Sequence, residues 1–321
     1  MSDNEKPSCG DPSSAKSHDP RPLVSDDPIR AVIWITVAMA LFAVLAAASR
    51  QAALMGMHPL QIVFLRNVSA TLFLLPMLMV RGRSLLRSNA LPLYGLRVGI
   101  QLFSMTAWFY ALALIPIAEV TAISFLAPVF GTLGAIVFLG EKVRIRRWTA
   151  IIVGFIGAMI ILRPGTQEFG LGQLCAVLNA LGSGVVVALL KQLSSEDDSG
   201  KIVFLTTIMM VPLTLVPALF VWQTPGIEYL PIILTIGLTA VLGHYCLMRG
   251  FASTEASLVM TFDFSRLPFA VAIGWLAFGE IIDVWTWVGA AVIFASAVYI
   301  TRREARLRSQ ARIEKLAKKT E

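Results

Sequence analysis

Charged residues are scarce in this sequence: Asp, Glu, Lys and Arg make up 15% of its 321 residues, whereas 56% are hydrophobic. A soluble globular domain carries about 25% charged residues. The scarcity therefore excludes an ordinary soluble domain and indicates an integral membrane protein. The formal net charge is +7, but the basic residues gather at the C-terminus and in a few short stretches. That pattern sets membrane orientation and does not favour nucleic acid as a partner.

Cysteine and histidine are also rare, and neither is grouped. The three cysteines are Cys9, Cys175 and Cys246. They form no close pair and no metal-ligand spacing, which excludes a disulfide framework and a zinc site. The sequence contains no HExxH motif, no serine beside a base and no paired carboxylates at one membrane depth. We therefore predict no catalytic residues, no metal site and no cofactor, and we do not expect an enzyme.

An apolar leader is absent too. Residues 1–29 are rich in Ser, Pro and Asp and contain no hydrophobic core of a signal peptide, so they are predicted to be a disordered cytoplasmic tail. At the other end, residues 304–321 form a basic cytoplasmic tail. Its spacing suits contact with anionic lipid headgroups, and a solvated topology anchor is the alternative interpretation.

Long apolar runs, by contrast, fill the region between the tails. A spanning helix needs about 20 mostly apolar residues, and the chain offers ten such segments. They are 31–49, 59–80, 91–114, 118–139, 148–163, 170–191, 202–222, 229–250, 256–279 and 284–301. The third and fourth are divided only by Ile115 to Glu119, with Pro116 as the breaker. Nine spans are therefore the competing count.

Basic residues in the connecting stretches predict the orientation, because Lys and Arg flanks stay on the cytoplasmic side. With the N-terminus inside, the inner stretches hold Arg81, Arg83, Arg87, Lys142, Arg144, Arg146, Arg147, Lys191, Lys201 and Arg249. The outer stretches hold only Arg50 and Arg163. We expect a multi-pass protein of the bacterial inner membrane with both termini in the cytoplasm.

Two segments of the chain resemble each other. AEVTAISFLAPVFGTLGAIVFLGE at 118–141 and TEASLVMTFDFSRLPFAVAIGWLAFGE at 254–280 both open with a small residue and Glu, carry a Pro within the span and close on Gly-Glu. Five spans per half is an odd number, so the copies must lie with opposite orientation in the membrane. The predicted fold is all-α, with ten transmembrane helices in two inverted five-helix repeats, residues 30–164 and 165–303. Secondary transporters are built in this way, with substrate held near the midplane.

Several of these features together resemble the EamA transporters of the drug/metabolite transporter superfamily. They are the ten spans in paired halves, Arg66 in VFLRN, Pro128 with the Gly-Glu at 140–141, RLPF at 266–269 and FGE at 278–280. The resemblance extends from about Arg30 to Arg303. It implies a ten-helix fold, alternating access across the inverted repeat, and small organic metabolites as substrates.

Charged side chains inside the spans are the candidate binding residues. From a rise of 1.5 Å per residue, Arg97, His244 and Asp263 lie about 9 to 10 Å from the cytoplasmic end of their spans. Arg66 lies at a similar depth from the outer end, and Arg266 near the centre. Such groups must face the bundle interior or water. One hypothesis pairs Asp263 with Arg97 along a central cavity. In the alternative, Asp263 and Arg266 neutralise each other as i and i+3 neighbours on one helix.

Aromatic and amide side chains add further candidates with two interpretations each. Trp108, Tyr110 and Tyr245 can stack a planar substrate, or they belong to interfacial aromatic belts. Gln101 and Asn179 can bind substrate or form hydrogen bonds between helices. The glycines of GLRVG, Gly95 and Gly99, are expected to form a small-residue face for close helix packing, as are Gly154 and Gly157.

The sequence therefore predicts a secondary transporter of a small organic metabolite. A flavin-like vitamin, a nucleoside-like metabolite and an amino acid are all open as substrates, and an exporter of amino acids or other carboxylates is the alternative. No filter-like repeat favours a channel, and a receptor that binds without transport is a further alternative. The expected partners are the substrate and membrane lipid. A homodimer is left open.

Overall fold

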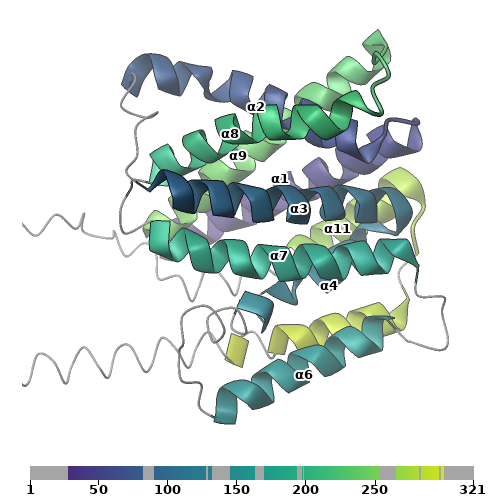
Figure 1. The fold of residues 1–321 in the computed structure, drawn as a ribbon. Helices are drawn as coiled ribbons and strands as arrows, with labels where there is room; N and C mark the ends of the chain where they lie inside the picture. The colour runs from purple at the N-terminus through teal and green to yellow at the C-terminus, as the bar shows by residue number, and fades with distance from the viewer. Residues whose placement is uncertain are drawn as a thin grey trace, which may run out of the picture.

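The computed structural model describes residues 28–81, 90–127, 129–131, 145–162, 170–193, 197, 199–253, 265–281, 283–295 and 298–299. Within these residues all regular structure is helical. The helices run side by side as a bundle (Figure 1). The first half of the chain contributes α1 (Pro28–Leu54), α2 (Pro59–Arg81), α3 (Leu91–Leu114), α4 (Ile117–Ser124) and α6 (Ile145–Leu162). The second half contributes α7 (Leu171–Leu193), α8 (Ser199–Leu219), the short η2 (Ile227–Tyr229), α9 (Leu230–Ser253), α11 (Arg266–Phe278) and a helix over Val284–Ala295.

The helix ends follow the punctuation in the sequence. The predicted span 91–114 coincides with α3, and the spans at 59–80 and 170–191 match α2 and α7 to within two residues. The uncertain boundary between the third and fourth spans is a true break. Ile115 is extended (φ −129°, ψ 162°), and Pro116 precedes the first residue of α4. Proline disfavours the helical conformation in the residue before it, which explains why α3 stops there.

Among the described helices, four are long and apolar enough to cross a membrane. They cover Val32–Leu54, Pro59–Pro76, Lys201–Leu219 and Ile227–Gly250. Shorter apolar helices lie at Ile117–Gly131, Leu171–Val186, Arg266–Phe278 and Val284–Ala295. Large apolar side chains on the outside of the bundle, such as Leu72, Phe103 and Leu276, are 54% to 74% exposed. Apolar surface of this kind suits lipid contact and is costly in water.

Two apolar clusters form the interior. One joins residues of α1, α3, α4, α6, α7 and α11, and the other joins residues of α1, α2, α3 and α9. Trp108 packs against both clusters. The broadest contacts between helices are those of α1 with α9 and of α3 with α7. Each of these contacts connects the first half of the chain to the second.

Glycine allows two of the closest helix approaches. A Cβ on Gly289 would lie 2.5 Å from the carbonyl oxygen of Gly157, so α6 and the helix over Val284–Ala295 touch through backbone. These two helices lie together at the bottom of Figure 1. A Cβ on Gly184 of α7 would lie 2.5 Å from the amide nitrogen of Gly131. The prediction of close packing at Gly157 is confirmed.

The corresponding prediction for GLRVG is wrong. Gly95 and Gly99 are exposed, and a Cβ added to either would meet nothing within 4 Å. The inward side of α3 is the opposite one, with Tyr94, Arg97 and Val98 buried. Arg50 also differs from expectation. It was predicted in an outer connecting stretch, but it lies within α1 and its side chain is turned into the protein.

Candidate functional site

Four predicted site residues come together in the bundle: Arg66 of α2, Arg97 of α3, His244 of α9 and Arg266 of α11. All three arginines lie within electrostatic range of the His244 ring. We call these four residues the central cluster. In a low-dielectric interior a charge needs a partner, so the described contacts of each arginine indicate what else the central cluster can bind.

Arg66 makes only weak hydrogen bonds. Its Nη1 donates to Asn67 Oδ1 at 3.1 Å and to Met105 Sδ at 3.1 Å. An amide oxygen and a thioether sulfur are both uncharged, and sulfur is a poor acceptor. No carboxylate among the described residues pairs with Arg66. A guanidinium carries five N–H groups, and within the described part of the chain only those on Nη1 of Arg66 have an acceptor.

Arg97 is buried at 8% exposure. Its Nη1 donates to Thr206 Oγ1 of α8, and that hydroxyl in turn donates to the Ile202 carbonyl at 2.6 Å. Its Nε has no hydrogen-bond partner among the described residues. Asp263, the predicted partner, lies outside the described residues, so the proposed pair with Arg97 stays a prediction. Within the described chain the guanidinium of Arg97 faces a hydroxyl and no carboxylate.

Phe42 of α1 joins the other two members of the central cluster. The His244 ring meets it edge to face, with centroids 5.1 Å apart, and the guanidinium of Arg266 lies 5.2 Å from its centroid. His244 Nδ1 lies 2.7 Å from the Ala240 carbonyl oxygen. A carbonyl oxygen can only accept, so Nδ1 of His244 donates the hydrogen in this contact.

His244 lies on the inner side of α9. The outer face of α9 is marked by Leu234, Leu238, Leu242 and Tyr245, which are 40% to 49% exposed. His244 is on the same side of the helix as Ala240, which is 2% exposed, and Gly237, which is buried. Unlike these two residues, His244 is itself exposed, so its ring is accessible from the inner side of the helix.

Asn179 belongs to a different arrangement, a network that ties helices together. Ser104 Oγ of α3 lies 3.1 Å from Asn179 Oδ1 and 3.0 Å from the Asn179 carbonyl, and Asn179 Nδ2 donates to Ser124 Oγ at 3.3 Å. Ser183 Oγ also donates to Asn179 Oδ1 at 3.2 Å. The amide therefore has partners on both of its ends, and its residue is 7% exposed. This arrangement favours hydrogen bonding between helices over substrate contact.

The remaining predicted residues lie apart from the central cluster. Tyr110 contacts His58, with Oη 3.5 Å from Nε2. Tyr245 is on the outer face of α9, where its hydroxyl accepts a 3.0 Å bond from Arg249 Nε. Trp108 packs edge to face on Phe109 at 5.0 Å. Gln101 keeps a buried Oε1 with no described partner, so it stays a candidate for substrate contact.

Phe42 and Thr206 contact the central cluster, but the sequence does not mark them as site residues. Phe42 is one of 18 phenylalanines, and nothing in its neighbourhood marks it. Thr206 gave the only available signal, since a hydroxyl on an apolar span needs an acceptor. Threonine satisfies that need within its own helix, so the signal is weak.

Comparison with known proteins adds the wider context. Residues 29–163 and 170–302 each match the model of the EamA-like transporter family. A riboflavin transporter of Vibrio cholerae is 31% identical over 88% of this chain and 96% of its own length. A riboflavin transporter of Rhizobium johnstonii is 32% identical over 87% and 94%. An S-adenosylmethionine uptake transporter of Rickettsia bellii is 26% identical over 79% and 87%. A solved crystal structure that is 18% identical superposes with a TM-score of 0.59 over 86% of this chain and 98% of that one.

Proposed function

This chain belongs to the EamA-like transporter family, and from that premise we propose that it is an inner-membrane secondary transporter that binds a flavin-like metabolite at the central cluster. The protein is a multi-pass bacterial membrane protein of the drug/metabolite transporter superfamily, it carries a small metabolite, and it is not an enzyme.

We propose ten spans in two inverted halves, residues 30–164 and 165–303, with both termini cytoplasmic. The contacts between helices support this arrangement. If each helix of the first half corresponds to the helix five spans later, α1, α2 and α3 correspond to α7, α8 and α9. Under this correspondence, α1 is equivalent to α7 and α9 is equivalent to α3. The broad contact of α1 with α9 is then equivalent to the contact of α7 with α3, which is also broad.

Two tyrosines make contacts that are equivalent under the same correspondence between the halves. Tyr229, next to the start of α9, donates to the Met55 carbonyl between α1 and α2 at 2.6 Å. Tyr94, near the start of α3, donates to Asp197 Oδ2 between α7 and α8 at 3.1 Å. Each tyrosine thus binds the connection between the first two helices of the other half. An inverted repeat places such contacts at opposite ends of the bundle, and this supports the proposed topology.

The central cluster supplies the chemistry for a flavin-like substrate. The observation that carries the proposal is the pair Arg66 and Arg97, which have open N–H groups and no described carboxylate partner. A flavin ring presents carbonyl oxygens that accept such hydrogen bonds, and its flat surface suits the rings of Phe42 and His244. Two relatives that match this chain over nearly their whole length are named riboflavin transporters, and this also supports a flavin-like substrate.

A carboxylate substrate is the second candidate, because the same open guanidinium groups also suit a carboxylate. An amino acid exporter would use Arg66 and Arg97 as an anion site and would have no need of the aromatic surface at Phe42. Replacing Phe42 by Leu therefore separates the two. Flavin affinity is expected to fall, whereas carboxylate affinity is expected to stay within about threefold, since no stacking contact is lost.

The experiment is a transport assay with purified protein in liposomes. Radiolabelled riboflavin is loaded on one side and its appearance on the other is followed, with unlabelled riboflavin, S-adenosylmethionine and a panel of amino acids as competitors. We expect saturable riboflavin flux and counterflow, with riboflavin as the strongest competitor. Flux of an amino acid in preference to riboflavin would support the carboxylate exporter instead. Binding of either without any flux would contradict a transporter.

A further inference from the structure

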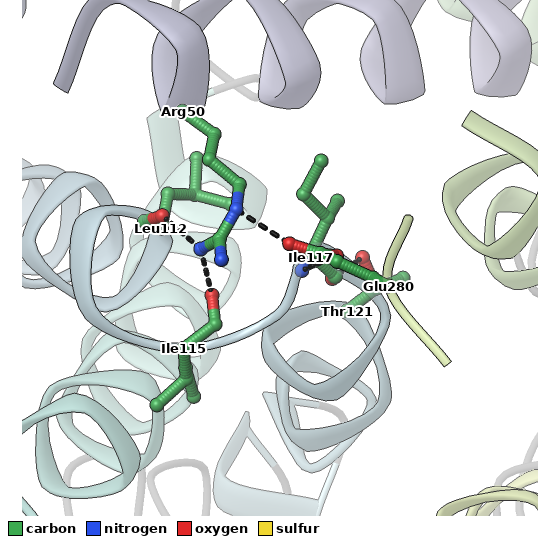
Figure 2. Close-up of polar contacts among 6 residues, drawn as sticks. All are labelled: Arg50, Leu112, Ile115, Ile117, Thr121 and Glu280. Carbon is green, nitrogen blue, oxygen red and sulfur yellow. Dashed lines mark hydrogen bonds and ion pairs between the residues drawn. The ribbon is translucent and has the colours of Figure 1, made fainter. Parts of the chain in front are cut away.

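A second polar site lies away from the central cluster, where the C-terminal ends of α1, α3 and α11 meet the start of α4. Arg50 Nε of α1 lies 2.5 Å from Glu280 Oε1, and the two side chains are only 13% and 8% exposed. Figure 2 shows the guanidinium and the carboxylate facing each other across the gap between these helices. Among the ion pairs between described residues, this one joins the two halves of the chain, whereas Lys201–Asp197 lies within the second half.

Arg50 and Glu280 each also bind backbone groups of complementary charge. Arg50 Nη1 donates to the carbonyl oxygens of Leu112 at 2.8 Å and Ile115 at 2.5 Å, where α3 ends. Glu280 Oε2 accepts from the Ile117 amide at 3.0 Å, where α4 begins (Figure 2). Carbonyls at a helix C-terminus attract a cation, and amides at a helix N-terminus attract an anion. The break between α3 and α4 therefore offers one acceptor site and one donor site side by side.

The turn after α11 aims Glu280 at this break. Gly279 adopts the left-handed conformation (φ 65°), and the amides of Gly279 and Glu280 donate to Trp275 and Gly274 carbonyls in the last turn of the helix. The bond from the Gly279 amide to the Trp275 carbonyl, four residues back, is the αL ending of a helix, which glycine adopts without a Cβ penalty. It reverses the chain so that the next side chain, Glu280, points back across the helix ends. The FGE motif thus has a structural meaning that the sequence alone did not show.

We propose that Glu280 is the movable part of a gate at this end of the transporter, and that Arg50 with the α3–α4 break is its fixed socket. The inference rests on the proposed alternating-access function, under which this end faces the outside. The contacts of Arg50 and Glu280 determine which interactions break when the gate opens. Among the described residues, Arg50 contacts the end of α11 through Glu280 and through the Phe278 ring, 5.7 Å from its guanidinium, and its other partners are the carbonyls of Leu112 and Ile115 in its own half. The described side-chain partners of Glu280, Arg50 and Ile117, are also in the first half. Outward opening therefore releases the end of α11, with Phe278 and Glu280, and leaves the contacts of Arg50 with Leu112 and Ile115 in place.

This asymmetry makes Glu280→Gln the informative variant. It removes the charge from the movable side and leaves the Arg50 contacts with Leu112 and Ile115 in place. Reversal of both charges is not expected to restore the gate, because a glutamate at 50 would face two carbonyl oxygens and an arginine at 280 would face an amide N–H. Glu228→Gln is the matched control, since Glu228 is an exposed carboxylate in η2 at the same end of the bundle.

The first test measures opening without any substrate. Thr121 is 6% exposed and lies one turn into α4, beneath the contact of Glu280 with Ile117 (Figure 2). In a background with Cys9, Cys175 and Cys246 replaced by serine, Thr121→Cys is labelled with a membrane-impermeant thiol reagent added outside liposomes. Glu280→Gln is expected to speed labelling about tenfold, because loss of one partner from a buried pair is strongly unfavourable. Glu228→Gln is expected to leave the rate unchanged. Equal rates in the parent and in Glu280→Gln would overturn the gate.

The second test locks the gate. Arg50→Cys and Glu280→Cys are joined in the cysteine-free background by a short, reducible bifunctional thiol reagent, and riboflavin flux is measured before and after reduction. We expect flux to stop on cross-linking and to return on reduction. Unchanged flux in fully cross-linked protein would show that these ends never separate. If the cysteine-free parent, with Arg50 and Glu280 in place, carries no riboflavin, the proposed function fails, but the labelling test still decides whether this end opens through Glu280.

Discussion

Replacing Arg66 by Gln separates a substrate-binding arginine from a structural one. Arg66 spends only Nη1 on the protein, with Asn67 Oδ1 and Met105 Sδ as acceptors, both at 3.1 Å and neither charged. Among the described residues, Nε and Nη2 of Arg66 have no acceptor, so we expect them to bind substrate. A hydrogen bond to a charged group contributes about 1.5 to 3 kcal/mol, so loss of one such bond is expected to raise the KM for riboflavin about 10- to 100-fold, at roughly 1.4 kcal/mol per tenfold.

Stability is expected to respond in the opposite way. The substrate-free protein holds Arg66 inside the bundle with no described carboxylate beside it, and an uncompensated interior charge is unfavourable. Arg66→Gln should therefore leave the apparent melting temperature in detergent unchanged or raise it. Arg66→Lys keeps the charge but loses the forked donors, so its KM for riboflavin should lie between the values for the parent protein and for Arg66→Gln.

The assay is initial riboflavin flux into liposomes across a range of concentrations, with unfolding followed on the same preparations. Arg249→Gln is the matched control. Arg249 is also a helical arginine bound to an uncharged acceptor, Tyr245, but it lies on the exposed side of α9. It should change neither quantity. If Arg66→Gln instead lowers the melting temperature and leaves KM unaltered, Arg66 is a packing residue, and the binding role assigned to it is wrong.

Other substitutions test the scaffold, each by thermal unfolding in detergent. Gly289→Ala should destabilise the protein by more than about 1 kcal/mol, since overpacking at a tight contact forces the backbone apart, and its Cβ would meet the Gly157 carbonyl at 2.5 Å; an unchanged melting temperature would contradict this contact. Gly95→Ala, at an exposed helical site with open space, should be neutral or stabilising by up to about 1 kcal/mol, and a large loss would contradict the lipid-facing position. Gly279→Ala should cost about 1 to 2 kcal/mol through its left-handed backbone alone, and Gly279→Asn less, because Asn tolerates that conformation; equal losses would argue against the turn. Asn179→Ala should lower stability and leave the KM for riboflavin within about twofold, because its partners are helix residues; a large rise in KM would return Asn179 to the substrate site.

The apolar runs are sufficient to place most of the helices, but they do not predict which side of each helix faces the interior of the bundle. Span length depends on local composition, so 91–114 was located to the residue. Which side a residue takes depends on distant neighbours. GLRVG and the pair Gly157 and Gly289 look alike as small residues in apolar helices, yet the first lies outside the bundle and the second forms a backbone contact.

The residues of the candidate site also differ in how far the sequence predicts their role. Arg66, Arg97, His244 and Arg266 were selected because a charge in an apolar span has to face inward, and that requirement holds whatever the partner. Asn179 was selected for the same reason, but an amide can be satisfied by serines on neighbouring helices, which only the structure reveals. Glu280 was passed over because it follows a span and does not lie within one. Its importance depends on the turn at Gly279 and on Arg50, far away in the sequence.

The strength of the contacts at each joint indicates which parts of the bundle stay together if the proposed gate opens. Tyr229 ties the start of α9 to the connection between α1 and α2, and Tyr94 ties the start of α3 to Asp197 before α8, and the structure contains both bonds at once. The broad contacts of α1 with α9 and of α3 with α7 lie along these ties. Separating either pair would uncover a large packed surface. Releasing the end of α11 breaks one ion pair, one backbone hydrogen bond and the contact of Arg50 with the Phe278 ring, and α11 packs less broadly on α1 and α4 than those two pairs pack together. Opening at the Arg50 end should therefore move α11 against α4 and leave those two helix pairs whole. A spin label at Ile281, which is 89% exposed beside the gate, should move away from a label on α4 when riboflavin is added, while labels on α1 and α9 keep their separation. A change between α1 and α9 with none at Ile281 would place the moving interface elsewhere.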